Sequence, residues 1–332
     1  MMHRRQVLVL LAAAGARVCG APPLVHAQPS AEQVLSDMHL STGDRQRVLG
    51  GEFVTADVPA VSDRDLSFAI AFLVKTSPDA LGKQVMSGNL VTADAQVQSW
   101  GELKGAGSLA DFARLKITSD EARALSAAKA GEALNLSAGE VAAFGAASGG
   151  PDAVLEVLRR MLLARHQAYR TSGLAGIAPY DRGGGHTTDH AADLRKASEA
   201  SAGLKKYLPA FQAVLLGYPK ATAPQMRESF FWVKSIIEGK ATYILTHLMA
   251  TPDGAAYALA RRQYYASTNY NGEQSVAGFL PVPDATVVVL ASHAFTDQVT
   301  GFGGSMKRSI GSSVMARKMR EIFEAGRKKV AS

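Results

Sequence analysis

The last third of the chain alternates between extended runs and tight turns, and this pattern restricts the fold more than any other feature. Five runs rich in β-branched and aromatic residues follow one another between residues 229 and 293. Turn signals such as Asn271-Gly272 and Pro283-Asp284 separate them. Because consecutive strands with such short connections pair in opposite directions, the pattern predicts an antiparallel meander. The predicted strands are Ser229 to Ile237, Lys240 to Ala250, Ala256 to Asn269, Gln274 to Pro281 and Ala285 to His293.

A long amphipathic helix is predicted after the meander, from about Ser305 to Lys329. Its predicted apolar stripe consists of Met306, Ile310, Val314, Met319, Ile322 and Phe323. The segment from residue 307 to residue 329 contains eight basic residues and only two acidic ones. We interpret most of these cations as a solvated outer face, and some as attractive to anionic lipid headgroups.

The first two thirds of the chain contain fewer strands and most of the helices. Strands are predicted at residues 52–58 and 65–74, with weaker signals at 95–104 and 111–117. Helices are predicted at residues 151–170, 189–206 and 209–216. The first of these has one stripe at three- and four-residue spacing, formed by Leu155, Leu158, Leu162, His166 and Tyr169.

The N-terminus has the three parts of a secretory signal. Arg4 and Arg5 supply positive charge, residues 7–16 form a short apolar run, and small residues occupy positions 25 and 27. The run is too short to cross a bilayer, which takes about 20 residues. We therefore expect residues 1–27 to be a signal peptide cleaved after Ala27, with export by the Tat or the Sec route to the periplasm or the medium.

Composition limits the chemistry of the exported part. Cys19 is the only cysteine and lies in the segment expected to be removed, so disulfides, thiol nucleophiles and thiolate metal sites are not predicted. Without Arg4, Arg5 and Arg17 the chain has 33 basic and 29 acidic residues, a net charge of +4. This modest excess does not favour nucleic-acid binding.

Two early strands, a helical block, a meander and a long final helix follow in that order between about Leu49 and Lys329. This order resembles the helix-grip fold of the START-like (SRPBCC-type) superfamily, in which a curved sheet wraps around the last helix and the space between holds apolar ligands. The resemblance implies an α+β fold with a START-like domain at 49–329 and a helical segment at 28–48. Residues 119–216 would be a helical insertion or lid, or alternatively a separate helical domain.

A second resemblance rests on two short stretches, residues 262–267 and 296–303. Both are similar to segments of exported bacterial proteins of unknown function. This resemblance implies no chemistry.

Six residues are predicted to contact a ligand in such a cavity: His166, Tyr169, Arg170, Trp232, His247 and Tyr265. The two histidines lie on apolar faces, where a buried histidine with a local hydrogen bond is the alternative interpretation. Arg170 is either a partner for a polar headgroup or a solvated arginine at a helix end. The aromatic residues either line the hollow of the sheet or fill its core.

Other chemistries find little support in the sequence. His186 and His190 stand four residues apart, but three glycines precede His186, which indicates a loop, and no metal site is predicted. There is no G-x-S-x-G, P-loop or G-x-G-x-x-G pattern, so no cofactor is predicted.

The function expected from the sequence is therefore binding, or binding and transfer, of a lipid or other apolar small molecule. Two alternatives remain open. One is a START-like cyclase, lyase or hydrolase that uses His166 or His247 as a base. The other is a non-catalytic envelope protein whose basic final helix contacts a partner or a membrane surface.

Overall fold

The computed structural model describes residues 29–88, 91–131, 134–301 and 303–331. The predicted signal peptide lies outside these residues, as does Cys19. None of the helices in the described ranges combines the length and the apolar character needed to span a membrane.

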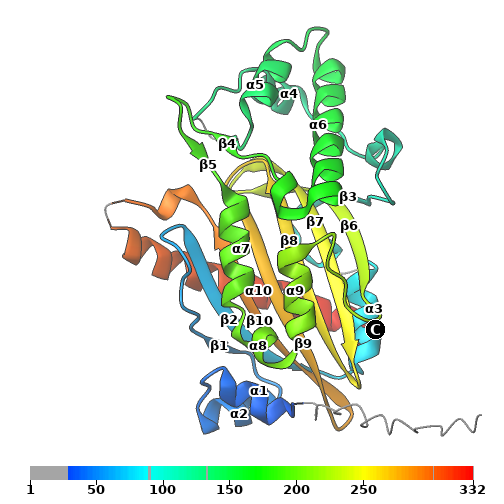
Figure 1. Ribbon diagram of the computed structural model, residues 1–332, viewed down its shortest axis with the longest axis vertical. Helices are drawn as coiled ribbons and strands as arrows, with labels where there is room; N and C mark the ends of the chain where they lie inside the picture. The colour runs from blue at the N-terminus through cyan, green and yellow to red at the C-terminus, as the bar shows by residue number, and fades with distance from the viewer. Residues whose placement is uncertain (1–28, 89–90, 132–133, 302, 332) are drawn as a thin grey trace, which may run out of the picture.

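The chain forms an α+β fold around a curved, eight-stranded antiparallel sheet that is not closed into a barrel (Figure 1). The strand order is β1-β2-β10-β9-β8-β7-β6-β3. The predicted meander is confirmed, because five successive strands occupy neighbouring positions in this order. They are β6 (Arg227–Ile237), β7 (Lys240–Asp253), β8 (Ala256–Ala266), β9 (Gly272–Val282) and β10 (Ala285–Phe295).

The turn between β6 and β7 shows how the local sequence sets the pairing. Ile237 pairs with Lys240, so only Glu238 and Gly239 form the loop. Both have positive φ, at 49° and 75°, which is the backbone of a type I′ hairpin turn. Gly239 adopts this conformation without steric cost, and the turn fixes the register of the whole β6–β7 pair.

The earlier strands extend the sheet at both edges of the meander. They are β1 (Val54–Ala56), β2 (Asp65–Val74) and β3 (Val97–Glu102), and β2 pairs with β10 while β3 pairs with β6. The strand predicted at 111–117 is wrong. Residues 109–112 form the 3-10 helix η2 (Leu109–Phe112), because Asp111 accepts a hydrogen bond from the Ser108 backbone and starts a helical turn.

One face of the sheet, called here the α7 face, is covered by α7 (His190–Ala200), α8 (Ala202–Tyr207) and α9 (Pro209–Gly217) (Figure 1). The single helix predicted at 189–206 is interrupted at Ser201, whose backbone is not helical. Toward the N-terminus, α1 (Ala31–Asp37) and α2 (Thr42–Leu49) pack on the same face against Val287 and Val289.

The opposite face, called the α10 face, is covered by α3 (Pro78–Met86) and α10 (Gly304–Ala331). Neighbouring residues of β8 separate the two faces: Leu259 packs with the α3 and α10 cluster, whereas Ala260 packs with α9. Phe72 of β2 is fully buried on the α10 face, with its ring 4.5 Å from the ring of Phe53 and 4.8 Å from that of Phe323.

The apolar stripe predicted for the last helix is divided in the structure. Met319, Ile322 and Phe323 pack against the sheet, whereas Met306, Ile310 and Val314 are exposed. The exposed residues repeat every four positions and the packed ones lie on another side of the helix, so only part of the predicted stripe is core.

The remaining helices come after β3 and before β6 along the chain, although these two strands are neighbours in the sheet. They begin with α4 (Ser119–Ser126), α5 (Ala138–Gly145) and the long α6 (Pro151–Ser172), which extend beyond one end of the sheet (Figure 1). The 3-10 helix η3 (Gly173–Gly176) and the two-residue strands β4 (Tyr180–Asp181) and β5 (Thr187–Thr188) then lead to α7.

Replacement of Phe72 by Ala tests whether α10 is held to the sheet by this aromatic contact. We expect the free energy of unfolding to fall by about 3–5 kcal/mol, because a buried phenylalanine is replaced by a cavity. Urea unfolding measures the effect. Ile310→Ala, on the exposed side of α10, is the control and should change stability by less than about 0.5 kcal/mol. Equal effects of the two variants would contradict this packing.

Candidate functional site

A row of polar side chains crosses the α7 face where a hydrophobic core is expected. The strand register places His293, Gln274, Arg262 and His247 opposite one another on β10, β9, β8 and β7. All four side chains are buried. Since a buried polar group without a partner costs folding free energy, each must be satisfied by its surroundings.

Arg262 is the centre of this row and joins four other elements. Its Nε donates to Gln274 Oε1 at 2.8 Å, and its Nη1 donates to the Tyr169 hydroxyl at 3.2 Å. Its Nη2 donates to Ser198 Oγ at 3.2 Å and to the Leu215 carbonyl at 2.7 Å. The guanidinium therefore links β8 to β9, α6, α7 and α9, and all three of its nitrogens have partners.

His247 lies next to this centre, and its contacts define its tautomer. An arginine can only donate, so the Tyr169 oxygen accepts from Arg262 and its hydrogen goes to His247 Nδ1, 3.0 Å away. The proton of His247 is then on Nε2, which lies 3.2 Å from Glu228 Oε2. This contact is close, but its direction does not give an aligned hydrogen bond.

Charge in this network is concentrated at its outer end. Complete burial lowers the pKa of His247 to about 4, so the imidazole is neutral at neutral pH. Contact with His247 and a hydrogen bond from Arg170 lower the pKa of Glu228 to about 2, so its carboxylate stays ionised. Arg170 Nη1 lies 2.6 Å from Glu228 Oε1 and 3.3 Å from the Tyr218 hydroxyl, and about a third of each charged side chain reaches solvent.

His166 belongs to the same region but makes separate contacts. Its Nδ1 lies 3.0 Å from the Tyr264 hydroxyl, and its Nε2 lies 3.4 Å from the Gly105 carbonyl. The Tyr264 ring stacks on the ring of Tyr169, with centroids 4.1 Å apart. Burial lowers the pKa of His166 as well, and both nitrogens of His166 already have partners.

The other two predicted residues lie farther along the same face. Trp232 donates from Nε1 to the Asp111 carbonyl at 2.8 Å and stacks on Phe112. Tyr265 packs beneath the guanidinium of Arg165, whose central carbon is 4.3 Å from the ring centre. All six predicted side chains are therefore on the α7 face, away from α10, and three of them, His166, Arg170 and His247, lie around a fourth, Tyr169.

Sequence reasoning did not single out Arg262, Glu228, Tyr218 or Tyr264. A signal for Arg262 was present, because Ala258, Ala260, Arg262 and Tyr264 alternate on one face of a predicted strand. A charged residue in such an inward series requires buried partners. The partners themselves come from helices some 45 to 95 residues away in sequence, which no local pattern reveals.

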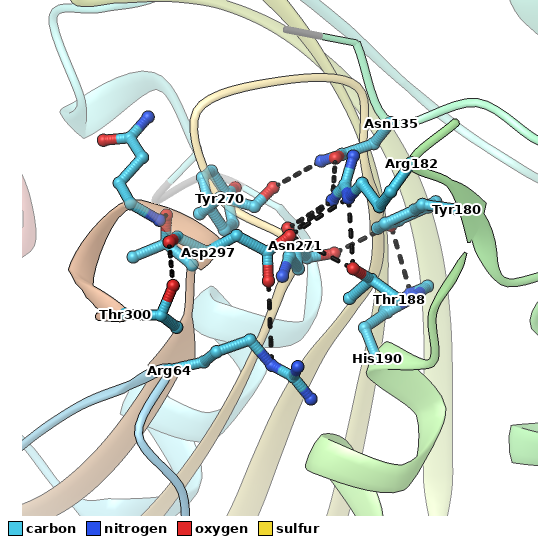
Figure 2. A network of polar contacts seen from close by, with 12 residues as sticks. Arg64, Asn135, Tyr180, Arg182, Thr188, His190, Tyr270, Asn271, Asp297 and Thr300 are labelled. Carbon is cyan, nitrogen blue, oxygen red and sulfur yellow. Dashed lines mark hydrogen bonds and ion pairs between the residues drawn. The ribbon is translucent and has the colours of Figure 1, made fainter. Parts of the chain in front are cut away.

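A second polar network connects the segment that contains β4 and β5 to the chain just before α10 (Figure 2). Arg182 lies 2.8 Å from Asp297 of η4 (Asp297–Val299), and it also donates to Thr188, Asn135 and Asn271. The other oxygen of Asp297 lies 3.8 Å from Arg64. These contacts fix the position at which the chain turns toward α10.

The α10 face has its own buried polar cluster. Glu273 Oε1 accepts from Arg261 at 2.6 Å, from Ser275 at 2.5 Å and from Ser292 at 3.0 Å. Burial acts to raise the pKa of Glu273, but the charge of Arg261 and the serine hydroxyls lower it below its ordinary value. The carboxylate is therefore ionised and only 5% exposed.

Arg261 is both desolvated and accessible. Loss of water is the largest influence on its pKa and lowers it, although Glu273 raises the pKa overall. Yet 30% of its side chain is exposed, on a strand in the middle of the sheet and on a face that two helices cover. We call the solvent-accessible space beside Arg261 on this face the α10 hollow.

Three elements carry polar side chains near this hollow. Gln263 is the next residue on the same face of β8, is partly exposed, and accepts from the Tyr270 hydroxyl at 2.6 Å. Lys318 of α10 contacts Gln96 and lies 3.9 Å from Asp94, both in the segment between η1 (Val91–Ala93) and β3. Asp94 also acts on the pKa of Arg261 through its charge. The neighbouring part of this face is apolar and includes Ile70, Leu259, Phe279 and Met319.

The two histidines at four-residue spacing lie in different environments. His186 is exposed in the loop before β5, whereas His190 is buried against the ring of Tyr180, and Asp189 caps α7. Across the described ranges, no group of three or more histidine, cysteine or acidic side chains is arranged to hold a metal ion.

Comparison of the chain with models of protein families, with curated proteins and with solved structures gives no match.

The buried histidines predict an acid-dependent loss of stability. His190 and His247 have pKa values of about 4 in the folded protein, below the ordinary value of 6.5, because burial disfavours their charged forms. Between these values the unfolded chain binds more protons, so stability is full above pH 6.5 and falls as the pH decreases toward 4. From about pH 7 to about pH 5, each histidine should remove about 2 kcal/mol.

Urea unfolding across this pH range measures the loss. His247→Gln should reduce the pH dependence by about 2 kcal/mol whatever its effect at neutral pH. His39→Gln, at an exposed position, is the control. An unchanged pH dependence in His247→Gln would contradict a neutral buried imidazole.

Asp297→Asn tests the network before α10. The variant keeps the size of the side chain but removes the ion pairs with Arg182 and Arg64, and we expect stability to fall by about 1–2 kcal/mol. Hydrogen exchange should become faster near residue 304, because Asp297 positions the start of α10. Asp120→Asn is the control, since its pair with Arg123 is exposed. Equal exchange in both variants would rule out this role.

Proposed function

We propose that this protein binds a lipid or another apolar small molecule in the α10 hollow, with the polar end of the ligand at Arg261. The observation that carries the proposal is the partly exposed side chain of Arg261, which lies on a central strand and on the face of the sheet that α3 and α10 cover. Apolar side chains lie on one side of it and hydrogen-bonding groups on the other. Such a gradient suits a ligand with an apolar body and one polar group.

The charges around Arg261 favour a neutral or zwitterionic polar group over a fully charged anion. Glu273 already pairs with Arg261, and Asp94 offsets Lys318 at the rim. The guanidinium hydrogens that Glu273 does not accept suit a ligand hydroxyl or carbonyl. Most of the affinity would come from the apolar body, at about 25 cal/mol per Å² buried.

The proposed fold is a helix-grip arrangement, and the topology supports it. The first long strand, β2, lies beside the last strand, β10, although more than 200 residues separate them. The chain crosses from β2 through α3 to β3 at the other edge and then returns strand by strand. The final helix lies over the face that α3 also covers, and the helices from α4 to α9 form an insertion on this frame.

The proposed location is outside the cytoplasm, after removal of residues 1–27, and it rests on the sequence of the leader alone. In that setting the binding of an apolar molecule serves its storage or its transfer between membranes. The catalytic alternative is not favoured by the contacts of its candidate bases. Both histidines are buried on the face away from the hollow, both nitrogens of His166 and Nδ1 of His247 have hydrogen-bond partners, and His247 Nε2 lies against Glu228.

Ligand capture tests the proposal directly. Protein purified from the producing cells without organic solvent should release a stoichiometric apolar compound on extraction, detected by mass spectrometry. Emptied protein should take up a fluorescent fatty acid with micromolar or better affinity. Protein that is empty and also fails to take up the probe would refute the proposal.

Gln263→Trp locates the site. The larger side chain would fill the α10 hollow beside Arg261, so probe affinity should fall by roughly tenfold or more. Lys240→Trp, at the exposed start of β7, is the matched control and should bind as the unchanged protein does. The double variant Arg261→Met with Glu273→Gln removes the polar end without leaving a buried charge, and should weaken binding of ligands with a hydroxyl most. Full binding by folded Gln263→Trp would place the ligand elsewhere.

A further inference from the structure

The outer face of α10 carries an apolar stripe that no other part of the described chain covers. Met306, Ile310 and Val314 are 71%, 60% and 46% exposed. They recur every fourth residue and so lie along one side of the helix. Among the described residues, only Leu49 and Leu109 are other large apolar side chains with comparable exposure. Three of five such residues on one helical face form a patch, whereas single exposed residues are ordinary.

The inner side of the same helix segment is fully used by packing. A side chain atom at Gly311 would lie 2.8 Å from Leu66, so the helix contacts the sheet closely there. Ala316 and Met319 are buried against β2 and its neighbours. The exposed stripe is therefore not a displaced core face. It is a second apolar surface on a helix whose first one is already occupied.

The charge of this segment is uniformly positive. From Gln298 to Arg320 there is no acidic residue, and the cations are Lys307, Arg308, Arg317, Lys318 and Arg320. Lys307 and Arg317 are exposed beside the stripe, whereas Arg308 donates to the Asp63 carbonyl and Lys318 contacts Gln96. The outer face thus combines apolar side chains with cations that have no acidic neighbour in the segment.

We propose that this face of α10, centred on Met306, Ile310 and Val314, docks the protein on the surface of an anionic lipid bilayer. Apolar side chains with flanking cations are the two components of helices that lie in a membrane interface. A second copy of the chain fits less well, because like charges would meet across a symmetric contact. Three partly exposed side chains also offer only a fraction of the roughly 800 Å² per partner of a specific dimer.

Co-sedimentation with lipid vesicles tests the docking. The protein as its cell processes it should sediment with vesicles of phosphatidylcholine and phosphatidylglycerol, more than with phosphatidylcholine alone, and less at high salt. The triple variant Met306→Ser, Ile310→Ser, Val314→Ser should lower partitioning roughly tenfold or more. Lys307→Gln with Arg317→Gln should lower it by a similar factor at low salt only.

The control is Leu49→Ser with Leu109→Ser, which removes similarly exposed apolar side chains from other surfaces and should leave partitioning unchanged. Thermal unfolding checks that each variant is folded. Equal sedimentation of the triple variant and the unchanged protein would overturn the proposal. So would an equal loss in the control, or a solution dimer that the triple variant dissociates without any lipid binding. Vesicle sedimentation needs no ligand in the α10 hollow, so its outcome is separate from that of probe uptake.

Discussion

The buried guanidinium of Arg262 is the interaction on which the arrangement of the helices depends. A charge at the centre of a sheet is tolerated only when every donor is satisfied. Here β9, α6, α7 and α9 each supply an acceptor, at 2.7 to 3.2 Å. The helices α6, α7 and α9 are therefore positioned relative to the sheet by directional bonds as well as by apolar contact. Removal of one acceptor would leave an unsatisfied charge, whereas loss of one apolar contact would leave only a small void.

The two faces of the sheet differ in how their polar side chains are satisfied. On the α7 face, histidines, tyrosines and Arg262 hydrogen-bond to one another, and Arg170 and Glu228 are in partial contact with solvent. On the α10 face, Arg261 keeps a third of its surface accessible while Glu273 balances its charge. Adjacent arginines on one strand thus point to opposite faces and have opposite environments. The α7 face, where most buried polar groups hydrogen-bond to one another, suits stability, and the α10 face, where Arg261 is partly exposed, suits a ligand.

Local patterns predicted much of the fold, and they failed where a choice between faces was needed. The hairpins of the meander, the long α6 and the final helix followed from period and turn residues. The strand expected at residues 111–117 was wrong because the capping pair of Ser108 and Asp111 outweighed a weak extended pattern. The six ligand-contact residues were chosen as polar or aromatic points in apolar stripes. Tyr169 and three others of the six do meet, but on the face that α10 does not cover.

The sequence by itself determined the element types, the antiparallel pairing of β6 to β10 and the amphipathic character of α10, because these depend on residues close together in the chain. Only the tertiary structure decided that Arg262 has buried hydrogen-bond partners and that Arg261 is partly exposed. The alternation of a strand shows that neighbouring side chains point to opposite faces, but it does not show which residues each side chain contacts. Only the tertiary structure decided which half of the α10 stripe is core. A helix with apolar residues on two sides can bury either, and the packing of α10 against the sheet buries Met319 and Phe323 and leaves Met306 and Ile310 outside.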